Sequence, residues 1–187
     1  MQLNVLWTGR EYYSLENCLV EISAAGAEIN STIVGLYNEI IYKADYCIKV
    51  NEHWETIFAE LCCRHNDIMQ HITLERDRDG WIYNGRKAEE FSTCTDIDIP
   101  LTPFTNTLPI NRLKLDHNAQ QEIRVIYCDL LERQLKPVSQ RYTRLTKTEY
   151  HYENVPNDFE ATIRVDEFGL VVDYPELFVR TATARIC

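Results

Sequence analysis

Two aspartates, Asp96 and Asp98, have a spacing that suggests chemistry. In an extended strand, side chains two positions apart point to the same face, so both carboxylates would share one surface. Such a pair could act in acid–base catalysis, hold a hard cation such as magnesium, or pair with carbohydrate hydroxyls. Asp173 could join them if the closing strand lies nearby. In a purely structural role, the same carboxylates would accept hydrogen bonds from loop amides.

The segment after this pair combines stiffness with polarity. Prolines at positions 100, 103 and 109 restrict the chain, and Thr105, Asn106 and Thr107 supply short polar side chains between apolar anchors. Such a segment suits the positioning of groups against a ligand, and Arg112 could meet a phosphate or carboxylate. The alternative is that the segment closes one end of a barrel, with its Asn and Thr residues capping turns.

The run from Cys94 to Arg112, CTDIDIPLTPFTNTLPINR, resembles the signature of the Putative glycolipid-binding family of bacterial proteins, first described as a family of unknown function. That signature is a C-D-x-D stretch, then T-P-x-T-N-T-L-P-I and a basic pair before Leu. The sequence departs from it at Asn111, where the family more usually has Arg, so one charge of an anion clamp is missing. Arg112 matches.

The resemblance extends over most of the chain. Trp7 begins a W-x-G-x-E-like start, and the run from Tyr46 to Trp54 is similar to the family's strand ending in Trp. DGW at 79–81 and DEFGLVVDYPELF at 166–178 match two further motifs. The resemblance implies a fold similar to the periplasmic lipoprotein carrier and its outer-membrane receptor. It also implies a cytoplasmic protein that binds or processes a glycolipid. Trp54 and Tyr174 lie in these motifs, and aromatic faces suit sugar or lipid.

Strict alternation of apolar and polar residues is the main structural signal. The runs 40–50 and 159–165 alternate cleanly, and 122–131 and 177–186 do so less cleanly. Asp79-Gly80, Asn84-Gly85 and the turn at 167–169 can supply the positive φ that hairpins need. Short helices are expected at 86–91 and near Thr105 or Thr107, with Pro109 tolerated in the first turn.

These patterns predict a mainly β fold. It would be a single curved antiparallel sheet forming an incomplete or split barrel around an apolar cavity, with one or two short helices. Residues 1–187 would form one domain. ITLERDRDGWIYNG and ATIRVDEFGLVVDYP are weakly similar, which raises an internal duplication of roughly 1–90 and 91–187 as a hypothesis.

Charge and cysteine usage restrict the partners and the compartment. The net charge is -10 and no basic patch stands out, which disfavours nucleic acid and anionic membranes as partners. No transmembrane segment and no signal peptide are expected. The seven cysteines are odd in number and scattered without a CxxC, so we expect free thiols and a cytoplasmic location.

Other metal and nucleophile candidates are weaker. Cys62 and Cys63 are adjacent and would face opposite ways in a strand, so a zinc site with His65 and His71 is disfavoured. No G-x-S-x-G is present, which disfavours a hydrolase triad. We expect no metal and no cofactor.

The sequence therefore favours binding of a glycolipid or other acyl-chain amphiphile in an apolar cavity with a polar mouth, in glycolipid transport or metabolism. The candidate ligand-binding residues are Asp96, Asp98, Thr105, Asn106, Thr107, Arg112, Trp54 and Tyr174. Two alternatives stay open. One is an enzyme of glycolipid metabolism that uses Asp96, Asp98 or Asp173 as acid, base or metal ligand. The other is a structural or interaction module. Assembly as a homodimer is a separate possibility that the sequence leaves open.

Overall fold

The computed structural model describes residues 1–186, and most of them belong to one β-sheet. Its N-terminal half contains β1 (Gln2–Gly9), β2 (Ser14–Ser23), β3 (Gly26–Tyr37), β4 (Ile40–Asn51), β5 (Thr56–His65), β6 (Ile68–Asp77), β7 (Gly80–Tyr83) and β8 (Arg86–Lys87). The C-terminal half contains β9 (Asp96–Asp98), β10 (Gln120–Asp129), β11 (Gln134–Arg144), β12 (Glu149–Val155), β13 (Glu160–Val165), β14 (Val171–Tyr174) and β15 (Phe178–Ile186).

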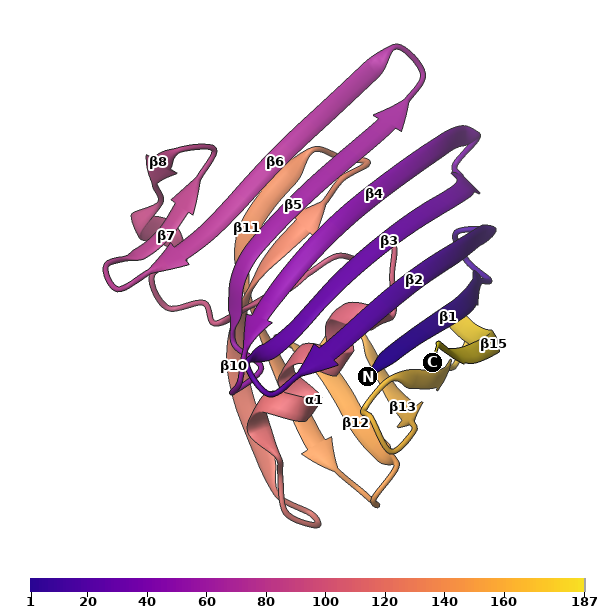
Figure 1. Ribbon diagram of the computed structural model, residues 1–187, viewed down its shortest axis with the longest axis vertical. Coiled ribbons are helices and arrows are strands. Elements are labelled where there is room, and N and C mark those ends of the chain that lie inside the picture. Colours follow the sequence, from indigo (N-terminus) through magenta and orange to yellow (C-terminus); the bar gives the residue numbers. More distant parts are fainter. Residues whose placement is uncertain (187) are drawn as a thin grey trace.

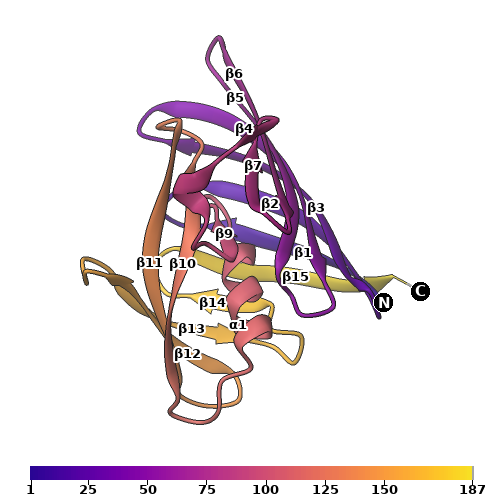
Figure 2. The ribbon, with the colours of Figure 1, turned by 90° about the vertical axis from the view of Figure 1, so that its left-hand side faces the viewer.

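The sheet is strongly curved, and its edges do not meet. The strand order runs β8-β7-β6-β5-β4-β3-β2-β1-β15-β14-β13-β12-β11-β10-β9, so β8 and β9 are the two edges. The halves join where β1 pairs with β15 (Figure 1). Figure 2 shows the two halves as facing walls with helix α1 (Thr107–Leu113) between them. The prediction of a curved, incompletely closed sheet with little helix is confirmed.

The alternation in the sequence forms the inner and outer faces of this sheet. In β4, Tyr42, Ala44, Tyr46, Ile48 and Val50 are buried, and the residues between them are exposed or half-buried. The predicted turns also form, with Gly80, Gly85 and Gly169 at positive φ. Burial of one side-chain face of each strand therefore specifies the register of the strands.

One strand pair departs from the predicted antiparallel arrangement. β9 and β10 are parallel, with Val125 opposite Asp96 and Tyr127 opposite Asp98. Side chains alternate with the same period of two in parallel and antiparallel strands, so the alternation could not reveal this pair. Parallel neighbours need a long crossover, which residues 99–119 supply with α1.

Both predicted helical regions are present, and both are short. Glu89–Phe91 forms a 3-10 turn, although Arg86 and Lys87, which were expected to be helical, form the edge strand β8. A second 3-10 turn, Phe104–Asn106, leads directly into α1. Pro109 is the third residue of α1, where its missing N–H has no helical partner to lose. None of the helices in residues 1–186 has the length and apolar character needed to cross a membrane.

The segment between the walls fills the concave side of the sheet. Ile99, Leu101, Phe104 and Leu108 are fully buried and join the core cluster formed mainly by the N-terminal half. Ile110 joins the second core cluster, which belongs to the C-terminal half. The signature segment thus packs against both walls and fixes how far apart they stand.

Candidate functional site

The aspartate pair lies at the edge of the sheet, where Asp96 is buried and Asp98 is half-buried, and both side chains are hydrogen-bonded within the protein. Asp98 accepts a hydrogen bond from the Thr105 hydroxyl at 2.9 Å and one from Gln140 Nε2 at 2.7 Å. Burial raises the pKa of Asp98, and these two donors offset part of that rise. Asp98 therefore ties the start of the signature segment to β11 in the C-terminal wall.

Asp96 forms an ion pair with Arg112. Arg112 Nη2 donates to Asp96 Oδ2 at 2.6 Å, and Arg112 Nε lies 3.2 Å from both carboxylate oxygens. The Asp96 side chain is fully buried and that of Arg112 is 16% exposed. Burial raises the pKa of Asp96, an effect that the guanidinium opposes. The bond joins the C-terminal turn of α1 to β9.

Asn106 and Thr107 lie at the beginning of α1 and are also buried. Asn106 Oδ1 accepts a hydrogen bond from the Tyr142 hydroxyl at 2.9 Å, and its Nδ2 lies 3.3 Å from the Pro103 carbonyl oxygen. Among residues 1–186, the Thr107 hydroxyl has no hydrogen-bond partner. Asn106 and Arg112 therefore hold the two ends of α1 in place.

Glu16 completes this polar interior and was missed by the sequence analysis. It lies on the inner face of β2, and its Oε1 accepts hydrogen bonds from Tyr46 at 2.6 Å, Ser31 at 2.7 Å and Thr102 at 2.9 Å. Burial raises its pKa to about 7, although the three hydroxyls favour the charged form. The only signal was that Glu16 shares its parity in β2 with the apolar residues Cys18 and Val20.

The eight candidate residues therefore fall into two groups. Seven have little contact with solvent: Asp96, Thr105, Asn106, Thr107 and Tyr174 are buried, and Asp98 and Arg112 are half-buried. Tyr174 packs among Tyr152, Phe159 and Phe178. Their burial favours a positioning role, and direct ligand contact by them stays a prediction. The eighth, Trp54, is half-buried in the wall of a pocket.

That pocket, which we call the end pocket, lies where one end of each wall meets α1. It has a volume of about 700 Å³, within the usual range for ligand sites. The lining residues come from six segments: Met1, Ile22, Trp54, Ile110, Asn111, Lys114, Arg144, Lys147, Thr148, Tyr150, Val165, Asp166, Glu167, Phe168 and Gly169. Apolar and aromatic side chains thus share the pocket with three basic ones.

Local geometry holds two parts of the lining of the end pocket in position. Trp54 has a φ of +63°, an uncommon value for a bulky residue, within a turn whose amides donate to Asn51 Oδ1. Elsewhere in the lining, Asn111 Nδ2 donates to the Phe168 carbonyl oxygen at 2.9 Å, which holds the 166–169 turn against α1. Gly169, at a φ of +75°, leaves room for Asn111, since a Cβ there would lie 2.3 Å from Asn111 Oδ1.

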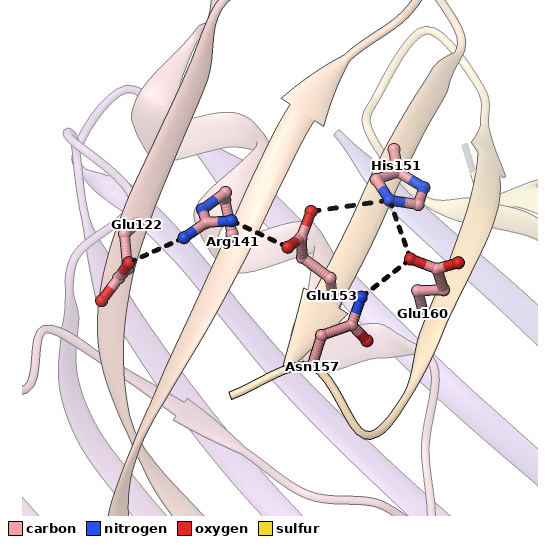
Figure 3. A network of polar contacts seen from close by, with 6 residues as sticks. All are labelled: Glu122, Arg141, His151, Glu153, Asn157 and Glu160. Carbon is pink, nitrogen blue, oxygen red and sulfur yellow. Dashed lines mark hydrogen bonds and ion pairs between the residues drawn. The ribbon is translucent and has the colours of Figure 1, made fainter. Parts of the chain in front are cut away.

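A second polar cluster lies on the outer face of the C-terminal wall and is distinct from the end pocket (Figure 3). Arg141 bridges Glu122 and Glu153, at 3.2 and 2.8 Å, across three neighbouring strands. His151 lies 3.6 Å from both Glu153 and Glu160, which face each other on β12 and β13. This row of cross-strand pairs stabilises the register of β10 to β13.

Two of the aspartates considered for metal binding or acid–base chemistry each lie beside a different arginine. Asp173 lies 3.6 Å from Arg10, while Asp96 pairs with Arg112. Cys62 and Cys63 face opposite sides of β5, as predicted. Within residues 1–186, no group of three or more His, Cys, Asp or Glu side chains is arranged to hold a metal ion. Six cysteines are free thiols, and Cys187 lies outside the described residues.

The fold and these motifs define the class of this protein. It is a β protein with one curved, open sheet that carries the signature segment on its concave side. The chain belongs to the Putative glycolipid-binding family, whose sequence model matches residues 4–180. It is similar in structure to a DUF1089 family protein from Pseudomonas aeruginosa, with a TM-score of 0.78 and 33% identity over 88% of this chain and 91% of that one. No curated protein matches the chain.

Proposed function

We propose that this protein binds a glycolipid or a related acyl-chain amphiphile in the end pocket, in glycolipid transport or metabolism in the cytoplasm. The observation that carries the proposal is the pocket itself, in which apolar side chains and a basic rim are combined. An amphiphile needs both, because its chain gains from leaving water while its head group keeps polar partners. The family's name agrees with a lipid ligand.

Within this proposal, Trp54 and Phe168, which both line the pocket, contact the apolar part of the ligand. A neighbouring hollow of about 760 Å³ shares Met1 and Ile22 with the end pocket and gives a longer chain room to continue. The other seven candidates have a positioning role in this proposal. They fix α1, which carries Ile110 and Asn111 into the pocket wall.

Uptake of a fluorescent acyl probe tests the proposal. Phe168→Ala and Trp54→Ala should each weaken probe binding roughly tenfold, because removing an aromatic contact of this size costs on the order of 1–2 kcal/mol. Phe159→Ala is the matched control, since Phe159 is also a partly exposed Phe just outside a strand but lies outside the end pocket. Equal probe affinity in all four proteins would refute the end pocket as the binding site.

A further inference from the structure

The charge of the end pocket is opposite to that of the chain. The protein has 29 acidic and 19 basic residues, yet Lys114, Arg144 and Lys147 come together around this one pocket. They belong to different segments: Lys114 is the C-terminal cap of α1, Arg144 is the last residue of β11, and Lys147 lies in the β11–β12 connection. None of the three takes part in a salt bridge among residues 1–186.

The acidic residues of the pocket do not neutralise this rim. Asp166 Oδ1 accepts hydrogen bonds from the amides of Phe168 and Leu170, and its Oδ2 pairs with Arg180. Its charge is therefore compensated by Arg180 and by these two amides. Glu167 is exposed on the same turn, and no salt bridge of the described residues includes it. Three positive charges thus face one free carboxylate.

Arg144 is the fixed member of the rim. Its Nη1 donates to the Leu115 carbonyl oxygen at 2.7 Å, and its Nε donates to the Thr146 carbonyl oxygen at 3.0 Å. These bonds hold the guanidinium in one place but leave its charge without an acidic partner. Lys114 and Lys147 are exposed, so their ammonium groups are free to move toward a ligand.

We propose that the amphiphile bound in the end pocket carries an anionic head group, a phosphate or a carboxylate, recognised by Lys114, Arg144 and Lys147. This inference rests on the proposed function and adds the class of ligand. An anionic head group would neutralise the positive charge of this cluster. The guanidinium of Arg144, already held in place by its backbone partners, can make directional hydrogen bonds to such a group. The local cluster also offsets the repulsion that a chain of net charge -10 exerts on an anion.

Titration calorimetry with dodecyl phosphate and dodecyl maltoside, below their micelle concentrations, tests the inference because the two share a chain and differ in the head group. Dodecyl phosphate should bind at least roughly tenfold more tightly at low salt, and the preference should shrink as salt rises. The double variant Lys114→Gln/Lys147→Gln should lose most of the preference and keep its affinity for the maltoside. Lys136→Gln, an exposed lysine on β11 outside the end pocket, should keep the preference.

The possible outcomes separate the two proposals. Equal affinity for both amphiphiles, with both weakened by Phe168→Ala, would overturn the anionic head group and support the end pocket. Absence of binding for both would overturn the proposed function and this inference together. Inorganic phosphate alone serves as the third probe. If it binds as tightly as dodecyl phosphate, the rim recognises a free anion, and the assignment to a lipid head group is wrong.

Discussion

Glu16→Gln gives the most quantitative test of the polar interior. The substitution keeps the shape of the side chain and an acceptor for the Tyr46, Ser31 and Thr102 hydroxyls, while it removes the ionisable group. Burial raises the pKa of Glu16 from 4.5 to about 7. Between these two pH values the folded chain keeps a proton that the unfolded chain has released.

The direction of the pH dependence follows from this difference. Because the folded pKa is the higher one, the contribution of Glu16 to stability is greatest below about pH 4.5 and is lost as the pH rises toward 7. The loss is about 3 kcal/mol over the window, a large part of the stability of an ordinary domain. The Gln variant lacks this term, so its stability relative to wild type should rise by about 3 kcal/mol between pH 4.5 and 8.

Urea denaturation of both proteins at several pH values measures the difference, and other titrating groups cancel in the comparison. Glu21→Gln, which changes an exposed carboxylate on the same strand, is the control and should track wild type. A difference between Glu16→Gln and wild type that stays constant from pH 4.5 to 8 would contradict the reasoning and show that Glu16 is charged throughout.

Three further predictions concern the fixed elements around the end pocket. Arg112→Ala should lower the free energy of unfolding by roughly 3–5 kcal/mol near pH 7, because Asp96 is left buried without its partner. Urea denaturation should show a smaller loss near pH 5, where Asp96 takes up a proton more readily. Gly169→Ala should cost roughly 1–3 kcal/mol in thermal or urea unfolding, since its φ is positive and a Cβ would meet Asn111; unchanged stability would argue against that contact. The Trp54→Gly variant should be more stable than the Trp54→Ala variant by roughly 1 kcal/mol, because Gly tolerates the positive φ, and both variants should bind the acyl probe equally weakly. An Ala variant as stable as the Gly variant would rule out backbone strain at this position.

Local patterns predicted the elements of this fold well. The alternation at 40–50 became β4, the Asp79-Gly80 and Asn84-Gly85 pairs became turns, and a helix began at Thr107 with Pro109 in its first turn. Each of these features depends on neighbours in the sequence.

Features that depend on long-range packing were not visible in the sequence. The acidic side chain of Glu16 is buried because Thr102, far away in the chain, lies against it. The basic rim joins Lys114 to Arg144 and Lys147 only after α1 has packed between the walls. Trp54 was identified through its motif, whereas its place in the same pocket as Phe168 required the folded chain. Compartment, oligomeric state and internal duplication stay predictions.

Tryptophan quenching by an amphiphile with a brominated acyl chain tests the central claim most directly. Bromine quenches an indole ring at close range, and of the three tryptophans Trp7 and Trp81 are fully buried, while Trp54 lines the end pocket. The proposal predicts saturable quenching in wild type that Phe168→Ala shifts to higher amphiphile concentration and Trp54→Phe abolishes. Quenching that persists in Trp54→Phe, or saturable binding of the amphiphile with no quenching in wild type, would place the acyl chain outside the end pocket and contradict the account.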